Sequence, residues 1–90
     1  MLKIWGKTLK HNKMIESYMV QYDMELTHEA VFDGLYEICK KFDIARPIVL
    51  DKHKRDMNDF LLMRFLPQDF IEDVDFDRLE IEIYLEKKNK

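Results

Sequence analysis

Three aspartates near the end of the chain alternate in a way that could hold a metal ion. In an extended backbone, Asp73, Asp75 and Asp77 would place their carboxylates on one side. Hard ions such as Mg²⁺ and Ca²⁺ prefer oxygen ligands of this kind. The segment lacks the turn glycine and the bidentate glutamate of an EF-hand loop, so the aspartates are candidate metal ligands without a recognised calcium-binding motif.

These aspartates are part of a segregated distribution of charge. Acidic residues crowd the C-terminal segment, whereas residues 3–13 carry lysines and no acid. One explanation is that the first and last strands are neighbours in one sheet, where Lys3 and Lys7 would face Glu80 and Glu82. A second explanation is a solvated acidic face that keeps a strand edge from pairing with other molecules. The third is the metal site.

A dense basic cluster is the next feature with chemical potential. Lys52-His53-Lys54-Arg55 falls in a segment that we expect to be a polar, solvated loop. The chain has a net charge of -3, and few cations in an acidic domain make a poor footprint for nucleic acid. We therefore consider Lys52, Lys54 and Arg55 as candidate contacts for a protein partner, and nucleic-acid binding as disfavoured.

The histidines and the cysteine predict no catalytic or zinc site. His11, His28 and His53 are not spaced to place two imidazoles on one helical face, and each is expected at the surface. Cys39 falls within an apolar helical stripe, so we expect a buried thiol without nucleophilic reactivity. The chain also lacks a glycine-rich phosphate loop, and we expect no cofactor.

The single tryptophan is a further candidate for binding. Trp5 shares with Lys7 the face of the first strand opposite Leu2 and Ile4. Two interpretations remain open: residues 60–66 could form a second layer that covers Trp5, or Trp5 could be an exposed anchor for a partner, where aromatic residues are enriched.

The elements that would position these residues begin with a hairpin and a helix. Residues 2–9 and 14–22 have the alternation and the β-forming side chains of two strands joined by a polar turn. Thr27 is a good N-cap for a helix over residues 27–42, in which Gly34 indicates a close backbone approach. The apolar stripe of this helix comprises Val31, Leu35, Ile38 and Phe42.

The second half of the chain is harder to assign. Residues 48–50 predict a short strand after Pro47, and residues 60–66 predict a short helix or turn that leads into an extended piece. Residues 70–76 and 79–86 predict two strands or one kinked strand, because their apolar positions change parity between them.

Composition sets the class of protein. The chain has 90 residues, of which 47% are hydrophobic and 37% are charged, so we expect one globular domain over residues 1–90. No apolar run approaches the roughly 18 residues of a membrane span. The first residues do not read as a signal peptide, and we expect a cytoplasmic protein.

Several short motifs also resemble a group of short uncharacterised proteins of anaerobic Gram-positive bacteria. The resemblance implies a cytoplasmic bacterial protein of about this length and supplies no activity, ligand or functional residue. The motifs are Arg46-Pro47-Ile48, Leu50-Asp51-Lys52, Arg64-Phe65, Phe70-Ile71-Glu72, Phe76-Asp77 and Leu79-Glu80-Ile81.

Together these patterns predict an α+β fold. We expect a small antiparallel or mixed sheet, made of the hairpin and two or three further strands, with one main helix on one face. The leading function is a small binding or protein-interaction module without catalytic activity, with self-association through a sheet edge or the Trp5 region as one form. The alternative is a carboxylate-based or divalent-metal-dependent enzyme that uses Glu72, Asp73 and Asp75, with Asp51 as a fourth carboxylate.

Overall fold

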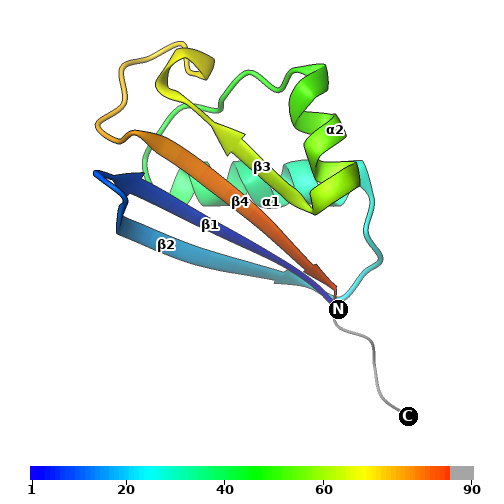
Figure 1. The fold of residues 1–90 in the computed structure, drawn as a ribbon. Coiled ribbons are helices and arrows are strands. Elements are labelled where there is room, and N and C mark those ends of the chain that lie inside the picture. Colours follow the sequence, from blue (N-terminus) through cyan, green and yellow to red (C-terminus); the bar gives the residue numbers. More distant parts are fainter. Residues whose placement is uncertain (86–90) are drawn as a thin grey trace.

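The computed structural model describes residues 1–85 and places four strands in one antiparallel sheet (Figure 1). The strand order is β2-β1-β4-β3, so the first and last strands of the chain are neighbours in the middle of the sheet. The elements are β1 (Leu2–Lys10), β2 (Lys13–Tyr22), α1 (His28–Lys41), α2 (Asp51–Phe60), β3 (Leu62–Phe65), the short 3-10 helix η1 (Pro67–Asp69) and β4 (Arg78–Leu85). The expected α+β class is confirmed, and the sheet is antiparallel.

The predicted N-terminal hairpin closes through two residues in the left-handed region. His11 and Asn12 have φ values of 53° and 62°, and Lys10 pairs with Lys13 across them. A two-residue loop with positive φ at both positions matches the twist of the strands that it joins. The polar break between the predicted strands is therefore a tight turn.

The helix expected over residues 27–42 is present as α1. The hydroxyl oxygen of Thr27 accepts a hydrogen bond of 3.0 Å from the backbone N–H of Ala30, which caps the first turn. Lys40 and Lys41 lie in the last turn, where positive charge favours the helix dipole. The side chains of Val31, Leu35 and Ile38 are fully buried, as the apolar stripe predicts.

Two glycines let α1 pack closely on β1. A Cβ added at Gly6 would overlap the Ile38 side chain, and a Cβ added at Gly34 would overlap the end of the Ile4 side chain. Each glycine thus receives an isoleucine from the other element. This arrangement explains why a glycine is found inside the helix despite its low helix propensity.

A second helix forms where the sequence predicted a polar loop. The expectation of one main helix is therefore wrong in part, because α2 covers Asp51–Phe60. His53 and Met57, one helical turn apart, are buried, and the His53 ring lies 4.4 Å from the ring of Phe65 in β3. The polar composition concealed this helix because only these two of its side chains are buried in the core.

Two other predicted strands are wrong. Residues 48–50 lead into α2 without strand pairing, and residues 70–76 are irregular. Phe70 and Phe76 are nevertheless buried, with their rings edge to face and 5.5 Å apart. The alternation in residues 70–76 therefore reflects burial of two aromatic side chains from a loop.

The ambiguous segment 60–66 divides between a helix end and a strand. Phe60 ends α2, Leu61 has a left-handed φ of 53°, and β3 begins at Leu62. The predicted C-terminal strand is confirmed as β4 up to Leu85, whereas its expected last residue, Glu86, lies outside the described residues.

Both helices lie on the same face of the sheet (Figure 1). The side chains of Leu2 and Ile4 in β1 and of Leu79 and Ile81 in β4 point to that face and are fully buried. α1 contacts β1 and β2, whereas α2 contacts β3. Within residues 1–85 no helix covers the opposite side of the sheet, which we call the open face. It carries Trp5, Lys7, Arg64, Arg78, Glu80, Glu82 and Tyr84.

None of the helices in residues 1–85 has the length and apolar character needed to cross a membrane.

Candidate functional site

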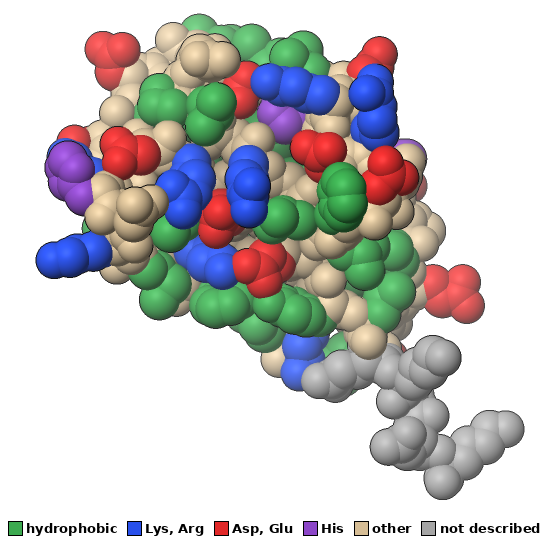
Figure 2. Space-filling view, viewed as in Figure 1, with side chains coloured by type: hydrophobic (Ala, Val, Ile, Leu, Met, Phe, Trp, Pro, Cys, Tyr) green, Lys and Arg blue, Asp and Glu red, His purple; other side chains and the backbone are tan. Residues whose placement is uncertain are grey.

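Cross-strand pairing assembles the open face from all four strands. One row across the sheet comprises Met19, Trp5, Glu82 and Leu62, and the next comprises Ser17, Lys7, Glu80 and Arg64. Figure 2 looks onto this face and shows basic and acidic side chains together at its centre, with hydrophobic side chains around them. The face therefore combines a charged centre with an apolar surround.

Glu80 is the centre of an ion-pair network. Only 8% of its surface is exposed, although no helix of the described residues covers this face. Its Oε2 accepts hydrogen bonds of 3.1 Å from the Nε atoms of both Arg64 and Arg78, and the Nζ of Lys7 lies 4.0 Å from its Oε1. The three cations thus surround one carboxylate, which satisfies its charge within the chain.

Glu82 continues the network toward the end of β4. Lys7 forms an ion pair with its Oε1, and the hydroxyl of Tyr84 donates a hydrogen bond to its Oε2. The bond from Lys7, followed by that from Tyr84, lowers the pKa of Glu82, and the same contact with Glu82 raises the pKa of Tyr84. The prediction that Lys3 and Lys7 face Glu80 and Glu82 is confirmed for Lys7, whereas Lys3 is paired with Tyr84 in the strand register. At neutral pH Glu82 is an ionised acceptor.

Trp5 lies beside this network and is half-buried. The Nζ of Lys7 is 4.2 Å from the centroid of the indole, a cation–π contact that orders both side chains. Residues 62–65 form β3, which belongs to the same sheet as Trp5, so they do not form a second layer over it. The indole is therefore partly accessible on the open face.

Aromatic and apolar side chains extend the open face toward its β3 edge. Phe60, which ends α2, is 72% exposed, and with Leu62 and Tyr84 it lines a shallow hollow of about 260 Å³. Sequence reasoning missed Phe60, Arg64, Arg78 and Tyr84 as members of a site. The even-numbered alternation with Glu80 and Glu82 could have identified Arg78 and Tyr84, but Arg64 required the pairing of β3 with β4.

The structure divides the three candidate metal ligands. Asp75 Oδ1 lies 3.0 Å from the Nζ of Lys10, and Asp77 Oδ2 accepts a hydrogen bond of 2.8 Å from the backbone N–H of His11. Asp73 is exposed nearby. Within residues 1–85 no group of three or more His, Cys, Asp or Glu side chains could hold a metal ion. Asp75 and Asp77 instead fasten the loop before β4 to the hairpin turn.

The remaining carboxylates of the enzyme alternative belong to different elements. Asp51 is exposed in the first turn of α2, where its charge favours the helix dipole, and Glu72 is exposed in the loop before β4.

The basic cluster lies on α2. Lys52, Lys54 and Arg55 are exposed, whereas the prediction of a surface position for His53 is wrong because its ring points into the core. α2 packs on the opposite side of the sheet from Trp5, so the partner-binding candidates form two separate surfaces.

His53 makes a buried contact that resembles a catalytic pair but acts as a helix cap. Its Nδ1 accepts a hydrogen bond of 2.9 Å from the backbone N–H of Leu50, which assigns the proton of the neutral ring to Nε2. Nε2 lies 3.5 Å from Oδ2 of Asp69, which accepts a hydrogen bond of 2.8 Å from the backbone N–H of Leu66. The pair joins the starts of α2 and η1, and its burial keeps it from substrate.

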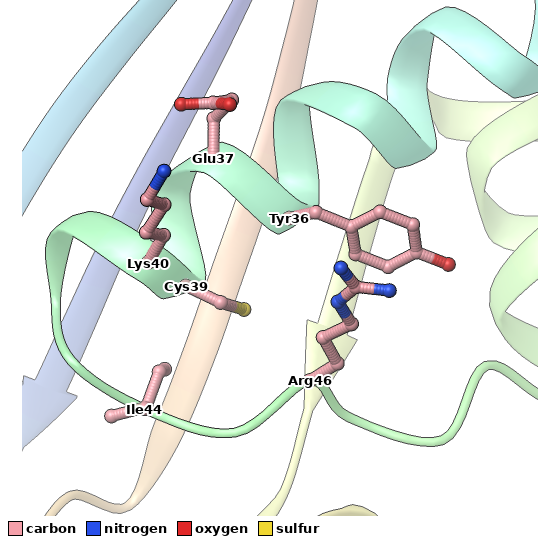
Figure 3. A pocket seen from close by; sticks show the side chains of 6 residues that line it. All are labelled: Tyr36, Glu37, Cys39, Lys40, Ile44 and Arg46. Carbon is pink, nitrogen blue, oxygen red and sulfur yellow. The ribbon is translucent and has the colours of Figure 1, made fainter.

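A shallow pocket of about 290 Å³ lies at the end of α1 and the loop after it (Figure 3). Cys39 lies at this pocket, and burial raises its pKa to about 11, although Arg46 nearby has the opposite effect. The guanidinium of Arg46 lies 4.1 Å from the centroid of the Tyr36 ring. The expectation of a buried thiol is confirmed, and a thiol with this pKa is protonated at neutral pH.

Comparison of the chain with models of protein families, with curated proteins and with solved structures gave no match.

Proposed function

We propose that this chain is a protein-interaction module that binds a partner protein on its open face. The observation that carries the proposal is the half-buried Trp5 beside an ordered charge network, on the side of the sheet that no described helix covers. Tryptophan, tyrosine and arginine are enriched where proteins bind one another, and a well-packed aromatic anchor commonly supplies much of the binding energy.

The charge network suits this role for an energetic reason. Lys7, Arg64 and Arg78 are already held by Glu80 and Glu82, so their side chains have lost much of their rotational freedom before a partner arrives. Binding would then cost less conformational entropy than ordering free lysine and arginine side chains, each of which costs roughly 0.5–1.5 kcal/mol.

The test is affinity capture from the native cell with three forms of the chain. The wild type and Lys54→Ala should retain one specific protein, and Trp5→Ala should lose it by at least tenfold. Because Trp5 is the only tryptophan, its fluorescence then reports binding of the purified partner directly. If Trp5→Ala retains the partner as well as the wild type does, or if only Lys54→Ala loses it, the interface is not the open face. Loss with Lys54→Ala alone would place it on α2.

A further inference from the structure

The two edges of the sheet are protected to very different extents. β3 is four residues long, carries Arg64 and lies against α2. β2 has ten residues, no proline, and only Lys13 and Glu16 as charges. Four of its apolar side chains are exposed, namely Met14, Ile15, Tyr18 and Met19. Natural proteins usually protect a long apolar edge, because its unpaired backbone groups can pair with another strand.

The surface of α1 beside β2 carries a divided pattern of charge. Asp33 and Glu37 precede Lys40 and Lys41 along α1, toward the end of the helix that follows Tyr22 in the chain. Burial, and then the charges of Glu37 and Asp33, raise the pKa of Tyr22. Near Tyr18, the Nζ of Lys41 lies 5.4 Å from the centroid of the ring. Lys40 and Lys41 line an open hollow of about 310 Å³ with Tyr18 and Glu37. This surface of α1, which we call the helix strip, is therefore acidic near Tyr22 and basic near Tyr18.

We propose that two copies of this chain pair antiparallel through β2, so that their sheets become one continuous eight-stranded sheet. A two-fold axis beside Met19 uses the regular part of β2, residues 16–22, and avoids the irregularity at the turn end of the hairpin. This axis places Tyr18 directly opposite Val20 of the second copy, and no like charges lie directly opposite each other.

The same axis makes the helix strips complementary. Neighbouring strands lie about 4.8 Å apart, so two α1 helices that each cover β1 and β2 have axes roughly 10–14 Å apart. Because the helices run antiparallel, Asp33 and Glu37 of one copy face Lys40 and Lys41 of the other. A second copy therefore fits both the strand edge and the charge beside it.

The dimer also closes. A two-fold interface uses the same strand from each copy, and the remaining edges of the joined sheet are the short, protected β3 strands. Association therefore stops at two chains. The dimer contact runs along the β2 edge and α1, whereas the proposed partner interface centres on Trp5 and Lys7 of β1; Met19, which pairs with Trp5, borders both. The α1 charge variants described below lie on the other side of the sheet, so they test the dimer separately from the partner interface.

Sedimentation equilibrium over micromolar to millimolar concentration tests the dimer. The wild type should approach twice the chain mass of 11.0 kDa, and Met19→Lys, which opposes two lysines at the axis, should raise the dissociation constant at least tenfold. Ile71→Lys is the matched control, because Ile71 is 83% exposed in the loop before β4 and does not belong to β2 or α1. A wild type that stays monomeric at millimolar concentration overturns the proposal. The exposed edge of β2 would then be open to pairing with a strand of a different protein.

Charge exchange on α1 provides a second measurement, which does not alter β2. Lys40→Glu with Lys41→Glu, and separately Asp33→Lys with Glu37→Lys, should each weaken self-association at least tenfold. An equimolar mixture of the two double variants should form a heterodimer. If Met19→Lys leaves the mass unchanged while it remains folded by circular dichroism, or if the mixture does not associate, β2 and α1 do not form the interface.

Discussion

The cationic side chains of the open face are largely neutralised within the face itself. Lys7, Arg64 and Arg78 share the carboxylates of Glu80 and Glu82. In the proposed interaction, this surface would select a partner mainly through shape, hydrogen bonding and the accessible part of the indole, because these three cations are already paired with carboxylates.

At this residue scale, Glu82→Gln should reveal a pH-dependent contribution to stability. The contacts with Lys7 and Tyr84 lower the pKa of Glu82 in the folded state, so its carboxylate stabilises the fold above the unfolded glutamate pKa of about 4.3. Wild type should exceed the variant by about 0.2–1 kcal/mol at pH 7, as for other cross-strand pairs. The difference should disappear as the pH falls through the lowered folded pKa.

Urea unfolding of wild type and Glu82→Gln at pH 7 and in acid measures this difference. Glu72→Gln, in an exposed loop, is the control and should show no such change. A difference between wild type and Glu82→Gln that stays constant into strong acid would rule out the ion pair as its cause.

Gly6→Ala should destabilise the protein through the contact of β1 with α1. The added methyl group would overlap Ile38, and overpacking of this kind costs about 1–3 kcal/mol. Gly34→Ala should cost less, because its Cβ meets the flexible end of Ile4 and alanine gains about 1 kcal/mol of helix propensity. In thermal unfolding, the cost of Gly6→Ala should shrink in an Ile38→Ala background, and equal costs in both backgrounds would refute the overlap.

At the scale of elements, the parts that sequence reasoning predicted are those with a regular period and a local end signal. The Thr27 cap with its apolar stripe predicted α1, and the alternation of Leu79, Ile81 and Ile83 predicted β4. The pairing of Lys7 with Glu80 followed from placing the first and last strands side by side.

α2 escaped prediction for a physical reason. A helix at the edge of a small core needs only a narrow inward face, here His53 and Met57, and the rest of its surface is polar. Its start is fixed by a local cap, in which Nδ1 of His53 accepts a hydrogen bond from the N–H of Leu50, and by a tertiary contact, in which Asp69 approaches Nε2. Histidine is not among the usual capping residues, and the tertiary contact cannot be recognised without knowing that η1 folds beside α2.

His53→Ala should therefore destabilise the protein more than substitution of an exposed residue of the same basic cluster. The change removes the acceptor for Leu50 and the ring packed on Phe65, at a cost of about 2–4 kcal/mol. Lys54→Ala, the exposed neighbour, should change the free energy of unfolding by less than about 0.5 kcal/mol. Urea unfolding followed by far-ultraviolet circular dichroism compares the two, and equal small effects would contradict the buried cap.

At the scale of the whole molecule, the arrangement is one-sided. Two helices and the apolar core occupy one face of the sheet, while the other face is stabilised by cross-strand ion pairs and a cation–π contact (Figures 1 and 2). A core on one side is sufficient for an antiparallel sheet. The second side has no helix over it within residues 1–85, and the proposed dimerisation through β2 would extend it across two copies.

The most direct measurement is site-specific photocrosslinking in the native cell, with a benzoylphenylalanine in place of Trp5 and, in a matched control, in place of Ile71. We predict an adduct between position 5 and one other protein that is absent from the position 71 control, although Ile71 is 83% exposed. Identical adducts at both positions, or none at position 5, would contradict the claim that the open face is the binding surface.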